Sequence, residues 1–243
     1  MEWSGKGIVL AVRPHGETSA IVDLLTEEHG RHAGLVRGGR SRTLRPVLQP
    51  GNSVSATWRA RLADHLGNYT VEADAHRAGL VMDDSLALAG LNSACALACQ
   101  ALPEREKHAP VYRAFEVLLD AMDDAEIWPA LYVRWEAGLL KDLGYGLDLS
   151  KCAATGETQD LTHVSPRTGR AVSREAAEPY IDKLLPLPAF LYNPEAGYGL
   201  GDIASGLALT GFFLQRRVLW PIDRDLPDAR VRLVRALTDA GRI

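Results

Sequence analysis

Apolar and polar residues alternate over short stretches in the first 75 residues, and turn-forming residues separate these stretches. In one of them Val54, Ala56 and Trp58 occupy one face while Ser, Thr and Arg residues occupy the other, as expected of a half-buried strand. The pattern predicts five strands, at residues 7–13, 18–26, 31–37, 52–60 and 68–73. Five short strands without a helical period favour a small closed barrel of the OB type over an open sheet, whose edges would need covering.

From about Leu80 onward, apolar residues recur at intervals of three and four, the spacing of amphipathic helices. One such series contains Leu88, Leu91, Cys95, Cys99 and Leu102, and others lie within residues 111–122, 127–143, 202–219 and 227–240. The helical spacing disappears in residues 147–174, which are rich in Thr, Gly and Ser. We therefore predict an α+β protein of two domains, a barrel at residues 1–80 and a helical domain at 81–243 with a compact inserted loop at about 147–174.

Composition describes an ordinary soluble globular protein, with 47% apolar and 24% charged residues among 243. The net charge of −4 conceals an asymmetry, because residues 1–80 hold ten Lys and Arg against eight Asp and Glu. Three cysteines and no signal peptide pattern indicate a cytoplasmic protein. The uncharged residues 85–102 are mostly alanine with several polar residues, which predicts a buried core helix and no membrane span.

The most informative stretch is residues 29–63, where 35 residues contain seven arginines and no Asp or Glu. Four of these arginines, Arg37, Arg40, Arg42 and Arg45, lie within nine residues around Gly38 and Gly39. Glycines let backbone N–H groups approach an oxyanion, and guanidinium groups bind phosphate in a bidentate manner. The segment predicts a phosphate-binding loop, although a solvated charged surface has the same composition.

A barrel with a basic groove and aromatic side chains is typical of proteins that bind single-stranded nucleic acids. Trp3, Trp58 and Tyr69 are the candidate stacking residues, while the position of Trp58 on the apolar face also fits a core residue. Arg13, Arg31, Arg59 and Arg61 lie on or beside other predicted strands and would spread positive charge over the length that a nucleic acid requires.

Catalysis finds little support, because no phosphate-binding P-loop, nucleophile elbow, zinc-protease or dinucleotide-binding motif is present. His29 and His32 flank Arg31, whose positive charge opposes a divalent cation. Cys95 and Cys99 lie four residues apart on an apolar helix, so they are best explained as small core residues. We predict no catalytic residue, no metal and no cofactor.

Four segments, residues 7–42, 48–54, 143–157 and 164–180, together resemble the RecO family of bacterial recombination mediator and DNA repair proteins, and they occur in the family's order. The resemblance implies an OB-fold followed by a helical domain with a zinc-finger-like insertion. It also implies a protein that binds single- and double-stranded DNA, anneals complementary strands and has no ATP-dependent activity. The implied partners are RecR, the C-terminal tail of single-stranded-DNA-binding protein (SSB) and, indirectly, RecA, in the cytoplasm at the nucleoid.

The resemblance places the basic loop, together with Lys6 and Arg13, in the DNA groove. The predicted DNA-binding residues are therefore Lys6, Arg13, Arg37, Arg40, Arg42, Arg45, Arg59 and Arg61. The chain departs from many members of the family at the insertion, because it retains only Cys152 of two Cys pairs, with His163 nearby. One thiolate and one imidazole cannot complete a tetrahedral zinc site, so we predict a loop without zinc.

Two other functions are compatible with the residues. The loop from Arg37 to Arg45 fits an enzyme that binds a phosphorylated small molecule. A transcription regulator that reads bases through a helix is the third possibility, although no short basic recognition helix follows a tight glycine turn.

Overall fold

The computed structural model describes residues 1–243, which form two compact units. The first unit contains Met1–Trp128 and Pro227–Leu233, and the second contains Pro129–Leu226 and Val234–Ile243. No helix is both long and apolar enough to cross a membrane.

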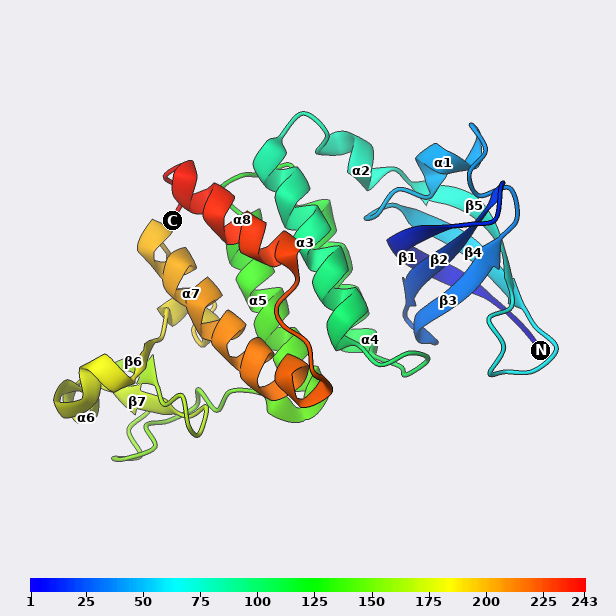
Figure 1. Ribbon diagram of the computed structural model, residues 1–243. Coiled ribbons are helices and arrows are strands. Elements are labelled where there is room, and N and C mark those ends of the chain that lie inside the picture. The colour runs from blue at the N-terminus through cyan, green and yellow to red at the C-terminus, as the bar shows by residue number, and fades with distance from the viewer. The chain divides into compact units, whose positions relative to one another are not determined.

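Five strands open the first unit: β1 (Glu2–His15), β2 (Ser19–Thr26), β3 (Gly30–Val36), β4 (Ser53–Arg59) and β5 (Asn68–Ala75). They form a closed barrel in the order β1-β2-β3-β5-β4, in which β1 also pairs with β4 (Figure 1). All neighbours are antiparallel except β3 and β5, which are parallel. The five strands that the alternation predicted are all present.

The interior of the barrel is filled by the apolar face of each strand. Val9, Val22, Leu24, Val54 and Trp58 are among the buried residues of this core. Strand β1 is longer than predicted, because the polar residues at its start face outward and carry little hydrophobic signal. A bulge between Val9 and Ala11 accompanies the change of partner along β1, from β4 at its start to β2 at its end.

The helices of the first unit are α1 (Leu44–Val47), α2 (Arg77–Leu80), α3 (Ser85–Ala101) and α4 (Ala109–Asp120). The carboxylate of Asp84 caps α3 by accepting hydrogen bonds from the backbone N–H groups of Leu86 and Ala87. Helix α3 packs on β1, where the Cys95 thiol lies 3.8 Å from the carbonyl oxygen of Val9. Cys95 is buried and Cys99 is half-buried, which confirms the interpretation of Cys95 as a core residue.

The second unit contains α5 (Trp128–Leu140), the short α6 (Arg174–Ala177), α7 (Leu200–Phe213) and the end of α8 (Asp228–Asp239). The turn after α5 ends in a left-handed residue, Gly144, with φ of 85°. Helix α7 continues into a wider π-helical segment, Leu214–Leu219. Helices α5, α7 and α8 occupy segments in which the sequence predicted helices, whereas the short α6 was not predicted.

The insertion differs from the predicted loop, because it contributes β6 (Leu161–Val164) and β7 (Ala171–Ser173) to a sheet completed by β8 (Leu185–Pro186). The strands are too short for their alternation to stand out from the sequence, although Leu161, Val164 and Ala171 are buried. A mixed polar segment therefore folds around a few apolar side chains.

Candidate nucleic-acid interface

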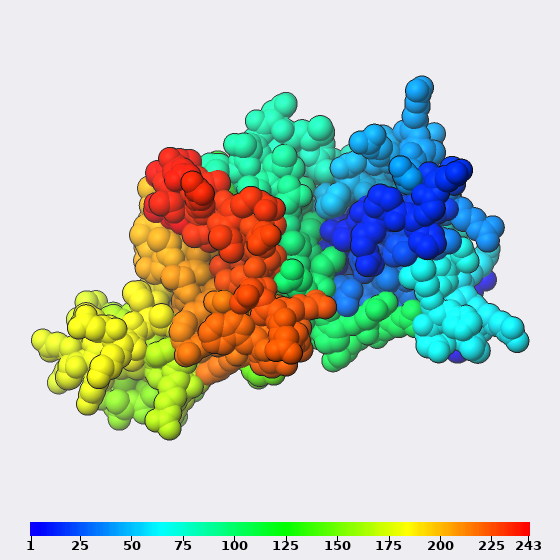
Figure 2. All heavy atoms as spheres, in the orientation of Figure 1, coloured from blue at the N-terminus to red at the C-terminus, as the bar shows by residue number.

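The basic loop joins β3 to β4 and includes α1. Gly38 adopts a left-handed conformation with φ of 67°, which reverses the chain directly after Arg37. The hydroxyl of Ser41 then accepts a hydrogen bond from the Leu44 backbone N–H at 3.2 Å and starts α1. In Figure 2 the segment around residue 40 projects from the surface of the barrel.

Arg40 holds this loop against the turn between β1 and β2. Its backbone N–H donates to the carbonyl of Thr18 at 3.0 Å. Its Nη1 atom donates to the carbonyl oxygens of Gly16 at 3.0 Å and Glu17 at 2.9 Å. The two loops therefore form one continuous rim at this end of the barrel.

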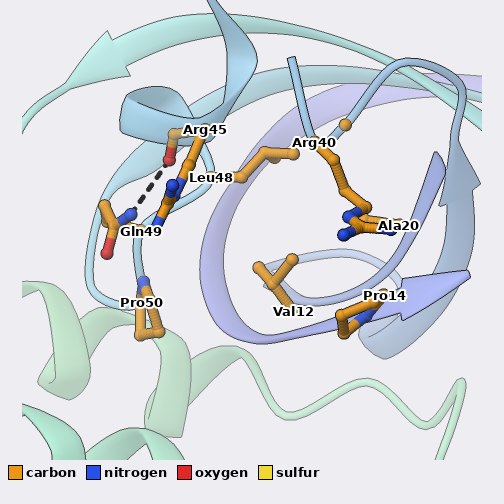
Figure 3. A pocket seen from close by; sticks show the side chains of 9 residues that line it. Val12, Pro14, Ala20, Arg40, Arg45, Leu48, Gln49 and Pro50 are labelled. Carbon is orange, nitrogen blue, oxygen red and sulfur yellow. Dashed lines mark hydrogen bonds between the residues drawn. The ribbon is translucent and has the colours of Figure 1, made fainter. Parts of the chain in front are cut away.

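A cleft of about 490 Å³ lies between these loops. It is lined by Val12, Pro14, Ala20, Gly39, Arg40, Arg45, Leu48, Gln49 and Pro50. Figure 3 shows Arg40 and Arg45 on opposite sides of Val12 and Leu48. The cleft thus combines an apolar floor with two cationic edges.

Three arginines of the loop, Arg37, Arg42 and Arg45, are exposed, and no acidic side chain forms an ion pair with them. No internal carboxylate therefore competes with an incoming anion for these guanidinium groups. Arg40 is also exposed, but its Nη1 atom is occupied by two backbone carbonyls. The loop therefore offers three uncompensated charges and one fixed guanidinium group.

The other predicted DNA-binding residues are engaged in ion pairs or lie elsewhere on the barrel. Arg13 lies at the same end as the loop, but it donates to the buried carboxylate of Asp23 at 3.0 Å. Lys6 pairs with Asp74 at 3.1 Å on the outer face of the barrel. These contacts reduce the charge that either residue presents to an anion.

Arg59 and Arg61 belong to the opposite end of the barrel. Arg59 faces Glu2 across the β1–β4 pair and contacts its carboxylate at 2.8 Å. The hydrogen bond from Arg59 lowers the pKa of Glu2. Arg61 is exposed in the loop between β4 and β5. Residues 2 and 13 lie at opposite ends of β1, so the strand separates the two groups by up to roughly 35 Å at about 3.3 Å per residue.

Two of the three candidate stacking residues are enclosed by the barrel. Trp58 and Tyr69 are only 2% and 4% exposed, so neither can stack on a base in this structure. Trp3 is half-buried and stacks on His29, with ring centroids 4.1 Å apart. The aromatic cluster closes the end of the barrel that carries Arg59, and its role is packing.

His32 belongs to the same cluster and has no metal-binding arrangement around it. The pKa of His32 is lowered to about 4, mainly by burial and to a smaller extent by the positive charge of Arg105. Its Nδ1 atom lies 3.2 Å from the hydroxyl of Tyr69. The imidazole is therefore neutral at pH 7 and serves as a polar core residue.

Sequence reasoning did not identify the apolar floor of the cleft. Val12 looks like an ordinary core residue in sequence, because an apolar side chain on a strand predicts burial and not a binding surface, yet it is only half-buried. Leu48 is a core residue, 3% exposed, beneath the cleft. Gln49 and Pro50 precede a turn glycine and carry no ligand signal of their own. The cleft arises only when the β1–β2 turn and the basic loop meet.

Comparisons with known proteins give one consistent assignment. The family described as "Recombination protein O N terminal" matches residues 1–74, and "Recombination protein O C terminal" matches residues 82–224. A protein of Phenylobacterium zucineum named DNA repair protein RecO is 55% identical over 243 residues, which is the full length of both chains. Proteins of the same name from Caulobacter vibrioides and Rhodospirillum rubrum are 52% and 53% identical, over at least 96% of every chain compared.

Proposed function

Because this chain belongs to the recombination protein O family, we propose that it acts in DNA repair and recombination as a DNA-binding mediator without catalytic activity. The family assignment supports the repair and recombination function. The observation that supports DNA binding is the cluster of exposed, unpaired arginines Arg37, Arg42 and Arg45 on a loop that Arg40 fixes in place.

The proposed interface is the end of the barrel that carries the basic loop, and Arg13 adjoins it. Cations that have no internal partner are the most available to phosphate groups. Each contact between such a cation and a phosphate also releases a counterion from the nucleic acid, which favours binding. Lys6, Arg59 and Arg61 would extend contact along the barrel, with weaker contributions from Lys6 and Arg59 because carboxylates already occupy them.

We assign the barrel to the OB-fold. The strand order β1-β2-β3-β5-β4, closed by the β1–β4 pair, supports this assignment, as does the short helix between β3 and β4. The family matches support a domain division at residue 80, because one match ends at residue 74 and the other begins at residue 82. The helical domain at 81–243 would then contain the insertion at about 147–174.

The insertion is proposed to fold without the zinc ion that the family resemblance implies. The Cys152 thiol accepts hydrogen bonds from the Ser173 hydroxyl at 3.4 Å and from the Thr155 backbone N–H at 3.5 Å. His163 Nδ1 lies 3.0 Å from the hydroxyl of Thr162. No group of three or more His, Cys, Asp or Glu side chains is placed to hold a metal, so the residues present do not fit zinc.

The further activities that we propose are those of a recombination mediator. The protein would bind single- and double-stranded DNA, anneal complementary strands, pair with RecR and contact the C-terminal tail of SSB. Together with RecR it would promote RecA loading onto SSB-coated DNA at the nucleoid. These proposals rest on the family assignment and not on a contact in this chain.

A second candidate is an enzyme that binds a phosphorylated small molecule in the cleft beside Arg40 and Arg45. The size of the cleft, about 490 Å³, favours this possibility. Its lining contains no carboxylate, histidine, cysteine or hydroxyl group that could act as an acid, base or nucleophile. The cleft is therefore better suited to binding than to catalysis.

The test is the affinity of a labelled thirty-base single strand at moderate salt, measured by fluorescence anisotropy. A variant with Arg37, Arg40, Arg42 and Arg45 changed to Ala should bind at least tenfold more weakly (about 1.4 kcal/mol) than the wild type. The matched control replaces four other exposed arginines, Arg113, Arg167, Arg232 and Arg235, and so has the same net charge. Equal losses in both variants would show that overall charge, and not the loop, determines binding.

A further inference from the structure

The cleft at the basic loop is lined in part by apolar side chains, which a phosphate group does not require. Half-buried Val12 and exposed Pro14 present apolar surface to the cleft, while Leu48 and Ala20, which are 3% and 1% exposed, lie beneath this surface in the core (Figure 3). A phosphate needs donors and positive charge, which the exposed arginines supply without an apolar floor. A ligand that fits the whole cleft must therefore be both apolar and anionic.

Arg40 has a geometry suited to a flat ligand. Its Nη1 edge is fixed by the carbonyl oxygens of Gly16 and Glu17, at 3.0 Å and 2.9 Å. A guanidinium plane held by its edge can stack against an aromatic ring, and it loses little freedom when it does so. A lysine at this position would keep the charge but would have no planar face.

Gln49 adds a polar group beside the apolar floor. Its side-chain Nε2 donates to the carbonyl oxygen of Arg45 at 3.0 Å, as the dashed line in Figure 3 shows. This hydrogen bond orients the amide and leaves Oε1 able to accept a hydrogen bond. Amide groups of this kind pair with the edges of nucleobases.

We propose that the cleft receives one unstacked base of single-stranded DNA, with Arg40 against the face of the base and Arg45 on a neighbouring phosphate. This inference rests on the proposed DNA-binding function, because it assigns the base-contacting part of the same interface. A nucleotide meets both requirements of the lining, since its base is flat and largely apolar while its phosphate is anionic. A base in a duplex must leave its stack to enter the cleft, so the site favours single strands.

The test compares two thirty-base single strands that carry the same label and the same number of phosphates. One strand has all its bases, and in the other every nucleotide is abasic. Stacking of a base on a protein side chain contributes enough for the wild type to bind the complete strand about tenfold more tightly than the abasic strand. Both affinities are measured by anisotropy with the full-length protein at one salt concentration.

Two charge-preserving variants locate the base. Arg40→Lys should reduce the preference for the complete strand over the abasic strand to within about twofold, because lysine has no planar face for the base. Arg42→Lys is the matched control, because Arg42 is exposed in the same loop but does not line the cleft. This control should retain the tenfold preference. Circular dichroism and thermal unfolding of each variant show that it is folded.

The outcomes separate this inference from the proposed function. If the wild type binds both strands with equal affinity, the base-binding site is refuted while phosphate binding at the loop stands. If Arg40→Lys keeps the full preference, bases are bound elsewhere and the assignment of the cleft is wrong. If the wild type binds neither strand, the proposed function fails and the inference fails with it.

Discussion

Asp23 connects three strands of the barrel, and its removal should destabilise the first unit strongly. The residue is 4% exposed, and its two carboxylate oxygens accept hydrogen bonds from Arg13 at 3.0 Å and Arg31 at 3.2 Å. Arg31 in turn donates from Nε to the carbonyl oxygen of Leu102, at the end of α3, at 2.9 Å. Asp23 therefore compensates a largely buried guanidinium group that also joins the barrel to a helix.

The two ion pairs of Asp23 contribute unequally to stability. The Arg31 side chain is 19% exposed, whereas that of Arg13 is 63% exposed. Removing one partner of a buried pair costs about 3–5 kcal/mol because the remaining charge is uncompensated, while an exposed pair contributes about 0–1 kcal/mol. Since Arg31 is not fully buried and keeps its bond to Leu102, we expect Asp23→Asn to cost about 3 kcal/mol.

This loss should lower Tm by roughly 6–12 °C in a chain of this size. Thermal unfolding followed by circular dichroism measures it, with Asp74→Asn as the control, because Asp74 pairs with the exposed Lys6. The control should cost less than about 1 kcal/mol. A loss below about 1 kcal/mol for Asp23→Asn would show that water or backbone groups satisfy Arg31 without this carboxylate.

Three further predictions concern a turn, a buried imidazole and the insertion. A Cβ on Gly30 would lie 1.6 Å from the carbonyl oxygen of Glu106, so Gly30→Ala should lower the free energy of unfolding in urea by more than about 3 kcal/mol. The control Gly16→Ala, at a similar positive φ but in open space, should cost about 1–2 kcal/mol. Equal costs for the two variants would exclude the steric clash. Because the pKa of His32 falls from 6.5 to about 4 on folding, the stability that its neutral form contributes above pH 6.5 should be lost progressively toward pH 4, by up to about 3 kcal/mol. An NMR titration that places the pKa of His32 near 6.5 in the folded protein would contradict this prediction. The purified protein should hold less than about 0.1 equivalent of zinc and keep its Tm in chelator, because Cys152 lacks the partners of a tetrahedral site; stoichiometric zinc would overturn that proposal.

The alternation of apolar residues was sufficient to predict all five barrel strands, because each of them buries one face in the same core. It was not sufficient to find the start of β1, where Ser4 and Lys6 point outward and only Trp3 packs inward. The short strands of the insertion were missed for a similar reason. Two or three buried residues in a strand do not establish a period of two.

The basic loop was predictable because charge and glycine content are local properties of the sequence. The pairing of Arg13 with Asp23, and of Arg59 with Glu2, depends on strand register and could not be read from composition. Likewise, the burial of Trp58 and Tyr69 follows from closure of the barrel. The sequence therefore identified the cations, while the structure distinguishes those that remain available to an anion.

The central claim is that the exposed arginines of the basic loop bind phosphate groups of DNA. The most direct test is the slope of log affinity against log salt for a thirty-base single strand, measured for the wild type and for the variant with Arg37, Arg42 and Arg45 changed to Ala. Each phosphate contact contributes roughly 0.7 to this slope, so its magnitude should fall by about two in the variant. An unchanged slope would contradict the account, because it would mean that the three arginines contact no phosphate.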